Sequence, residues 1–516
     1  MASTDTAVPP DLAKHRKLVT VAIMLATVMQ TLDSTIANVA LPHMAGNLSA
    51  SQDQISWVLT SYIVAAAIAT PLTGWMSGRF GRKRIFLISV VGFTVASALC
   101  GLATSLTQIV LARLLQGLLG AALVPLSQAI MLDTNPKEKH AQAMAIWGMG
   151  VMIGPILGPT LGGWLTDNFS WRWVFFVNIP VGILSFIGIQ LYIRETVVQT
   201  KLRFDVYGCV ALSLAIGLLQ MFLDRGELLD WFSSLEIQLE AAGALVSFAF
   251  FIALTATAKE VSFFNVQLLK DRNFVTGLVL YFMVGLLLYA TRALLPPMLQ
   301  SLMGYPVITA GLVIAPSGMG TMVAMLFAGR YAHRVDARGM IAVGFALTAW
   351  SLWQMSGYTF DTPQSSVVWS SVVQGLGLGF VSVPLTTMTF STLNPLYRSD
   401  GTAIYSLSRN IGSSIGISVM QTLLTRNTAL FHSQMVEHIN LASPAVQAGL
   451  PAVYNLATPQ GLAALNNEVT RQASFLATLN DFKIMMAVTL ASIPLLLLMR
   501  KQSHVAKPPV EAHAVD

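Results

Sequence analysis

The chain alternates between long apolar blocks and short polar connections. Each block holds about 20 residues, the length that a helix needs to cross roughly 30 Å of hydrocarbon. Strands of a membrane barrel would be shorter and would alternate apolar with polar residues, so helices are favoured. We therefore predict fourteen spans, near 18–42, 54–76, 85–105, 107–132, 141–163, 174–193, 206–224, 236–257, 274–295, 307–328, 339–356, 366–392, 403–424 and 481–499.

Positive charges fall mainly on one side of this arrangement. Of the 30 Lys and Arg residues, 22 lie in segments that would share a side with the N-terminus, 5 lie on the other side, and 3 lie within spans. Cytoplasmic connections carry the excess of Lys and Arg in membrane proteins, so both termini are expected in the cytoplasm. Met1 to Asp11 is polar and basic residues lead into the first span, so no cleaved signal is expected.

Composition narrows the class of protein. The chain is 54% hydrophobic and 10% charged, whereas soluble domains are about one-quarter charged. The net charge of +6 could indicate nucleic acid binding, but loop charges that set orientation explain it better. Cys100 and Cys209 lie in apolar blocks, and no nucleotide, metal or nucleophile motif occurs, so neither a cofactor nor an enzyme is expected. The energy for any transport would then come from an ion gradient.

Two short stretches of sequence recur in the same order. GWMSGRFGRKR at 74–84 resembles GRYAHRVDAR at 329–338, and QGLLGAALVPL at 116–126 resembles QGLGLGFVSVPL at 374–385. The repeat predicts an all-α membrane protein with two six-helix halves and two inserted helices, an arrangement suited to alternating access. The predicted parts are an N-terminal tail (1–17), a first half (18–193), a linker with two spans (194–273), a second half (274–499) with an external loop (425–480), and a tail (500–516).

Ionisable residues inside spans are costly and mark candidate functional positions. Asp33 lies in the first span, one helical turn from Gln30, and could exchange protons, contact cargo, or be a static hydrogen-bonded group. Arg113 shares a helical sector with Gln116 and Gln128; it could modulate a nearby carboxylate or anchor helix ends.

The second half contains two further cations within spans. Arg292 is near the outer end of its span and could reach the membrane interface or contact cargo. Arg409, followed by Asn410, is deeper and could line a cavity or bond between helices. The predicted substrate-binding set is therefore Gln30, Asp33, Gln116, Gln128, Arg292, Arg409 and Asn410.

Glycines and prolines form two further motifs. After the second span, glycines provide a tight turn and bases can hold helix ends, with Gly74, Arg79, Gly81 and Arg82 as the marked positions. The fifth span repeats glycine every fourth residue, which allows a close helix approach or a specific gating role, and its prolines bend it. The marked positions there are Gly150, Gly154, Pro155, Gly158, Pro159, Gly162 and Gly163.

Together these motifs resemble the major facilitator superfamily, specifically its fourteen-span drug:proton antiporters of the EmrB type. The matching stretches are LDSTIANVALP (32–42), the loop 74–84, Arg113 with Gln116, Gly117 and Gly120, and GVMIGPILGPTLGG (150–163) followed by WRWVFFVNIPVG (171–182). One position departs from the family pattern, since Gly78 replaces the usual acidic residue of the loop. That departure leaves the lock at the inner gate undefined.

The resemblance implies a proton-coupled exporter of small amphipathic drugs in a bacterial inner membrane. It also implies a role for Asp33 and Arg113 in proton coupling, and a periplasmic adaptor with an outer-membrane channel as partners. The long external segment 425–480, which could hold short amphipathic helices after Asn440, is a candidate docking site for the adaptor or, alternatively, a linker without a partner. Other readings are an uptake symporter of the same superfamily and, less favoured, a membrane-embedded enzyme or sensor.

Overall fold

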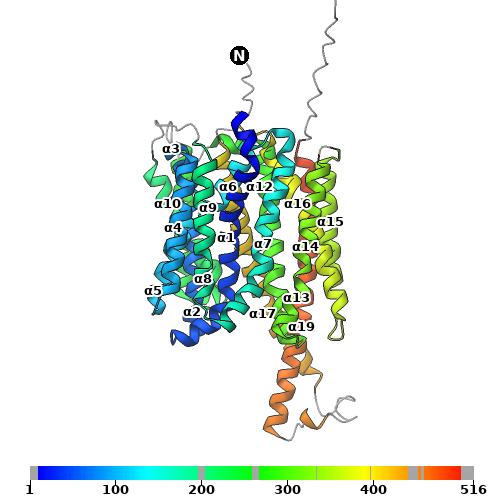
Figure 1. The fold of residues 1–516 in the computed structure, drawn as a ribbon. Helices are drawn as coiled ribbons and strands as arrows, with labels where there is room; N and C mark the ends of the chain where they lie inside the picture. The colour runs from blue at the N-terminus through cyan, green and yellow to red at the C-terminus, as the bar shows by residue number, and fades with distance from the viewer. Residues whose placement is uncertain are drawn as a thin grey trace, which may run out of the picture.

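The computed structural model describes residues 10–195, 204–257, 266–332, 334–394, 397–439, 451–454 and 458–500. The predicted tails before residue 10 and after residue 500, and much of the predicted external loop, lie outside the described residues. The described part is helical, and Figure 1 shows long helices running side by side in one bundle. The prediction of an all-α membrane protein is confirmed.

Helices occur at all the predicted spans, and several of them, such as α1, α17 and α19, begin or end well beyond the predicted bounds. In the first part of the bundle they are α1 (Pro10–Asn47), α2 (Gln52–Ala69), α3 (Leu72–Phe80), α4 (Arg82–Leu102), α5 (Leu106–Gly120), α6 (Leu123–Thr134), α7 (His140–Asn168), α8 (Trp173–Phe176) and α9 (Asn178–Tyr192). The two expected insertions are α10 (Val206–Arg225) and α11 (Leu235–Thr257). The remainder comprises α12 (Arg272–Pro297), α13 (Val307–Ile314), α14 (Pro316–Tyr331), α15 (Ala337–Met355), α16 (Gln364–Ser391), α17 (Arg398–Glu437) and α19 (Pro459–Ser492).

Length and composition single out the helices that can cross a membrane. Among the described residues, 11 helical stretches are long and apolar enough, and α2 with α3 makes a twelfth if this pair, bent by 55°, is one span. The bend falls at Thr70 and Pro71, where the α-helical hydrogen-bond ladder is interrupted. Helices α15 and α17 fall outside this set, yet both pack within the bundle against α16 and α12 respectively. This arrangement is compatible with fourteen spans.

Packing divides the helices into two groups around a shared centre. Helix α1 packs on α7 and α9, and α5 packs on α2 and α4. Helix α12 packs on α16 and α17, and α15 packs on α16 and α19. The groups meet where α7 contacts α14 and α16, and where α17 contacts α3, α6 and α10. Large apolar side chains such as Leu111, Leu191 and Leu245 are exposed, as expected for surfaces that face lipid.

The predicted external segment is more helical than expected. Helix α17 continues to Glu437 and α19 begins at Pro459, so both ends of the segment 425–480 are helical rather than looped. Together they project beyond the bundle at the end opposite the start of α1, shown in orange in Figure 1. His432 bonds Asn466 across the two helices at 3.0 Å, and Arg471 donates to the Leu302 carbonyl oxygen at 2.9 Å. Their polar sequence resembles a loop because it lacks the apolar pattern of a membrane span.

Candidate functional site

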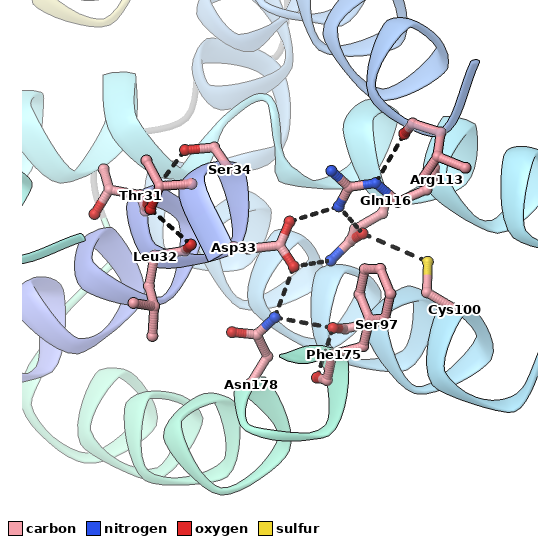
Figure 2. Close-up of polar contacts among 12 residues, drawn as sticks. Thr31, Leu32, Asp33, Ser34, Ser97, Cys100, Arg113, Gln116, Phe175 and Asn178 are labelled. Carbon is pink, nitrogen blue, oxygen red and sulfur yellow. Dashed lines mark hydrogen bonds and ion pairs between the residues drawn. The ribbon is translucent and has the colours of Figure 1, made fainter. Parts of the chain in front are cut away.

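A buried network of polar side chains joins α1, α5 and α9. Asp33 Oδ2 accepts from Arg113 Nη1 at 2.7 Å, and Asp33 Oδ1 accepts from Gln116 Nε2 at 3.0 Å and from Asn178 Nδ2 at 2.8 Å. Figure 2 shows the carboxylate of Asp33 between these three donors. All four side chains are almost completely buried. A carboxylate in hydrocarbon needs such partners, and the guanidinium also compensates its charge.

Arg113 is held from several sides. Its Nε donates to the Val58 carbonyl oxygen of α2 at 3.1 Å, and its Nη1 also donates to Gln116 Oε1 at 2.8 Å. The guanidinium carbon lies 4.4 Å from the ring centroid of Tyr62 and 5.6 Å from that of Phe175. These contacts fix the fork of Arg113 toward Asp33, so a change at this ion pair acts on α1, α2 and α5 together.

Asn178 was not among the residues predicted for the site. It lies in the conspicuous stretch 171–182, but its sequence position alone gives no indication that it reaches Asp33, 145 residues away. Asn178 Nδ2 also donates to Ser97 Oγ at 2.9 Å, and Ser97 donates to the Phe175 carbonyl oxygen at 2.9 Å. The network therefore extends from α1 through α4 to the turn before α9.

A cavity of about 570 Å³ lies between the two groups of helices. A volume in this range suits one drug-sized molecule. Five predicted residues line it, namely Gln30, Arg113, Arg292, Arg409 and Asn410. Asp33, Gln116 and Gln128 do not line it. Asp33 and Gln116 lie behind Arg113, and Gln128 is buried on α6, where its Nε2 has no hydrogen-bond partner among the described residues. Arg113 is thus shared by the cavity wall and the buried network.

The inserted helix α10 contributes to the cavity, which the sequence did not indicate. Asp224 and Glu227, at and just after the end of α10, line it, and Thr60 of α2 donates a hydrogen bond to Asp224. Gln220 Nε2 donates to Ser414 Oγ of α17 at 2.7 Å. Helix α10 therefore lies between α2 and α17 and closes this side of the cavity.

The glycine stripe of α7 is the contact surface for α1. A Cβ at Gly154 would overlap the backbone of Thr31 and Leu32, and a Cβ at Gly158 would overlap the Thr35 side chain. Thr35 Oγ1 also donates to the Gly154 carbonyl oxygen at 3.1 Å. The same stripe brings Gly150 onto Met24 and Gly162 onto Ile36, whereas Gly163 has free space, Pro159 is exposed and Pro155 lines the cavity. The close approach of α1 and α7 supports the segment that carries Asp33.

An inner charge cluster, defined as Arg82, Asp133, Arg398 and Asp400, lies at the end of the bundle where α1 begins. Asp133 of α6 forms ion pairs with Arg82 of α4 and, at 2.6 Å, with Arg398 of α17. Asp400 of α17 packs on Gly74 of α3 so closely that a Cβ there would overlap its carboxylate. The cluster ties α17 to α3, α4 and α6.

The other marked positions of the loop 74–84 have separate roles. Gly81 adopts φ +95°, a conformation that favours glycine, and a Cβ there would overlap the Glu195 carboxylate. Glu195 accepts hydrogen bonds from the backbone nitrogens of Lys83 at 3.0 Å and Arg84 at 3.1 Å. These two N–H groups at the start of α4 have no partner within the helix, and a negative charge is favourable there. Arg79 is half-buried at the end of α3.

A cavity between two groups of membrane-crossing helices, with a buried ion pair at its wall, defines a membrane transporter. The Major Facilitator Superfamily model matches residues 23–417. Among curated proteins, the multidrug export protein EmrB of Escherichia coli K12 is 36% identical over 460 residues, 88% of this chain and 90% of that protein. The fatty acid resistance protein FarB of Neisseria gonorrhoeae is 35% identical, over 95% of this chain and 96% of that protein.

The chain therefore belongs to the major facilitator superfamily and, within it, to the group of EmrB-type multidrug exporters. The probable multidrug resistance protein EmrY of E. coli K12 is 34% identical over 96% of both chains. Among solved structures, the human organic anion transporter MFSD10 (TETRAN) superposes with a TM-score of 0.60, covering 95% of this chain and 100% of that one. At 14% identity that likeness concerns the fold alone.

Proposed function

We propose that the protein is a proton-coupled antiporter that exports small hydrophobic or amphipathic compounds across a bacterial inner membrane, with both termini in the cytoplasm. The observation that carries this proposal is the ion pair between Asp33 and Arg113, because Arg113 also forms part of the cavity wall. A proton arriving at Asp33 neutralises the carboxylate and weakens its bond to Arg113. Cargo and proton thereby act on the same arginine from opposite sides.

Alternating access requires an end of the bundle that can open, and the inner charge cluster is our candidate. Its ion pairs hold α17 against α4 and α6, and we propose that they keep the cytoplasmic entrance closed. The family's usual loop acid is absent at Gly78. We infer that Asp400 supplies a replacement from α17, since it packs on Gly74 of the same loop and its charge acts on Arg82.

The coupling proposal is tested with purified protein in proteoliposomes. Efflux of an amphipathic fluorescent dye is driven by an imposed pH difference and compared with efflux at equal pH. Asp33→Asn keeps the shape of the side chain but replaces one acceptor oxygen with an NH2 donor and cannot exchange a proton, so the pH-driven component should fall to background. Asp361→Asn, at an exposed turn between α15 and α16, is the matched control and should match the wild type.

Two results would contradict the proposal. If Asp33→Asn keeps the wild-type pH-driven rate, Asp33 does not couple transport to protons. If the wild type instead moves dye in the same direction as the protons, the protein is a symporter.

The helical projection of α17 and α19 is our proposed docking site for a periplasmic adaptor that leads to an outer-membrane channel. It extends beyond the bundle, carries polar residues, and is tied to the bundle through Arg471, which bonds the Leu302 carbonyl oxygen and lies 4.3 Å from the Phe360 ring. Arg471 also hydrogen-bonds Glu468 and lowers the pKa of its carboxyl group. The base of the projection is therefore held in place relative to the bundle.

The bond between His432 and Asn466 indicates where the tip can be removed without disturbing the base. Joining Ser433 to Leu465 through a short Gly-Ser linker should abolish drug resistance in Gram-negative cells while preserving efflux in proteoliposomes, because only cells have the second membrane. A control that changes only the linker composition between 440 and 450 should retain resistance. Equal loss in both assays would show that the tip serves folding, and equal retention would remove it as a docking site.

A further inference from the structure

Two arginines line the cavity without an acidic partner among the described residues. Arg292 of α12 and Arg409 of α17 both line the cavity, and their charges act on each other repulsively. Arg409 Nη2 donates a long bond, 3.3 Å, to Asn410 Oδ1, the uncharged Tyr281 lies beside its guanidinium, and its Nε has no partner in the described part of the chain. Neither side chain takes part in an ion pair there. This differs from Arg113, whose charge is compensated by Asp33.

The acidic residues of the same cavity are engaged elsewhere. Asp224 accepts from Thr60, and Glu227 accepts from Trp231 Nε1 at 3.1 Å and lies near Arg426. The rings beside Arg292 and Arg409 belong to tyrosines, which carry no charge near neutral pH and so cannot act as counter-ions. The guanidinium carbon of Arg292 lies 5.9 Å from the Tyr289 ring centroid, and that of Arg409 lies 5.8 Å from the Tyr281 ring centroid.

Two half-buried guanidiniums that face one cavity repel each other, and an anion bound between them would relieve that repulsion. Planar guanidinium groups bind carboxylate, sulfonate or phosphate oxygens through paired charge-assisted hydrogen bonds. Elsewhere the cavity offers apolar and aromatic surface, with Trp147, Val284, Leu288 and Met325 among the lining residues. The cavity therefore combines an anion-binding side with room for an apolar body.

Resting on the proposed transport function, we infer that Arg292 and Arg409 form a subsite for the anionic group of an amphipathic cargo molecule. The cargo class is a single carboxylate or sulfonate on an apolar or aromatic body. The site is separate from the proton site, because Asp33 lies behind Arg113 and does not line the cavity. Cargo binding and proton coupling can therefore be disrupted independently.

A matched pair of fluorescent probes tests the subsite on the full-length protein in detergent. 1-Anilinonaphthalene-8-sulfonate carries a sulfonate, and N-phenyl-1-naphthylamine has the same aromatic body without it. Arg409→Gln and Arg292→Gln should each weaken binding of the sulfonate probe about tenfold, and leave binding of the neutral probe within about twofold. Arg330→Gln, an exposed arginine at the end of α14, is the control and should change neither.

Equal weakening of both probes would overturn the inference, because it would indicate lost packing rather than lost charge recognition. Unchanged binding of the sulfonate probe would overturn it as well. If the glutamine variants fail to fold, a competition experiment on the wild-type protein tests the subsite instead. Decanoate should displace the sulfonate probe, and the uncharged decanamide should not. Equal displacement by both competitors would contradict the subsite.

A nanodisc experiment distinguishes cargo from lipid. In discs of zwitterionic lipid the sulfonate probe should bind, and adding anionic phosphatidylglycerol should not displace it. Displacement by this lipid would overturn the assignment to cargo in favour of a lipid headgroup. Because none of these binding measurements needs a pH gradient, they remain valid if the coupling proposal fails.

Discussion

Arg113 and Arg409 lie on different walls of the cavity, and their surroundings differ. Arg113 is fixed by Asp33, Gln116, the Val58 carbonyl oxygen and two aromatic rings. Arg409 has the weak bond to Asn410 and a tyrosine beside it. A compensated cation suits an internal switch, whereas an uncompensated cation suits a ligand that brings its own negative charge.

The internal repeat sharpens this difference. Gln116 and Gln374 occupy matching positions in the two repeats, but Gln116 bonds Asp33 while Gln374 Nε2 donates to the Thr291 hydroxyl at 3.2 Å. The residue that matches Arg113 is Ser371. One copy of the repeat thus carries the charged network, and the other contributes cavity wall with a different chemistry.

The largest expected contrast is in stability. Arg113→Ala leaves the buried carboxylate of Asp33 without its counter-charge and should lower the free energy of unfolding by about 3–5 kcal/mol. Arg409→Ala removes a half-buried cation that has no acidic partner among the described residues, so stability should stay within about 1 kcal/mol or rise. Thermal unfolding of both variants in the same detergent measures the difference.

A double variant checks the cause of this contrast. Asp33→Asn in the Arg113→Ala background should restore part of the lost stability, because the unpaired charge is gone. If Arg113→Ala is no less stable than Arg409→Ala, the proposed difference between an arginine with an acidic partner and one without is wrong. Arg113→Lys should keep partial coupled efflux, since it keeps the charge but loses the planar fork.

A second prediction concerns two close helix contacts, one next to Asp33 and one near Arg409 on α17. Gly154 of α7 contacts the α1 backbone, and Gly412 of α17 contacts the Phe282 carbonyl oxygen of α12. Alanine at either site should destabilise the protein by about 1–3 kcal/mol through overpacking. Only Gly154→Ala should reduce pH-driven efflux more than dye binding, because only that contact positions Asp33.

The control for this prediction lies on α7 itself. A Cβ at Gly163 would be 4.0 Å from Val39 Cγ1, an ordinary contact, so Gly163→Ala should leave stability unchanged or improve it. Equal costs at Gly154 and Gly163 would show that helix α7 is sensitive to any added methyl group. The close approach to α1 would then have no special role.

The sequence predicts the fold better than it predicts the site. Blocks of apolar residues determine which segments cross the membrane, so the all-α membrane fold could be predicted from hydropathy alone. The segment 425–480 was predicted as an external loop with room for short helices only after Asn440, because a polar helix lacks the apolar pattern by which spans are recognised; the continuation of α17 to Glu437 was therefore missed. Asp33 and Arg113 stood out because charges within spans are rare.

Their partners could not be predicted in the same way. Asn178, Asp224 and Asp400 become significant only through contacts with distant segments, namely Asp33, Thr60 and Gly74. Neutral amides are common, and acids near span ends are expected in any topology. Helical periodicity places residues on a face of their own helix but does not show which neighbour that face meets.

The smallest expected effect concerns the inner charge cluster. Arg113 and Arg409 both line the cavity, and we propose that this cluster controls access to it. Asp400→Asn removes a charge next to Arg82 while keeping the volume of the side chain, and it should shift the population toward a bundle that is open at this end by a few-fold, about 1 kcal/mol. Gly74→Ala should act in the same direction, because its methyl group would overlap Asp400.

Distances between spin labels on cysteines introduced at Phe80 and Arg330 report the opening. The two native cysteines, Cys100 and Cys209, are buried and should not be labelled. Glu138→Gln, an exposed acid between α6 and α7, is the control and should leave the distance distribution unchanged. A distribution that is identical in wild type, Asp400→Asn and Gly74→Ala would show that Asp400 does not replace the missing acid at Gly78.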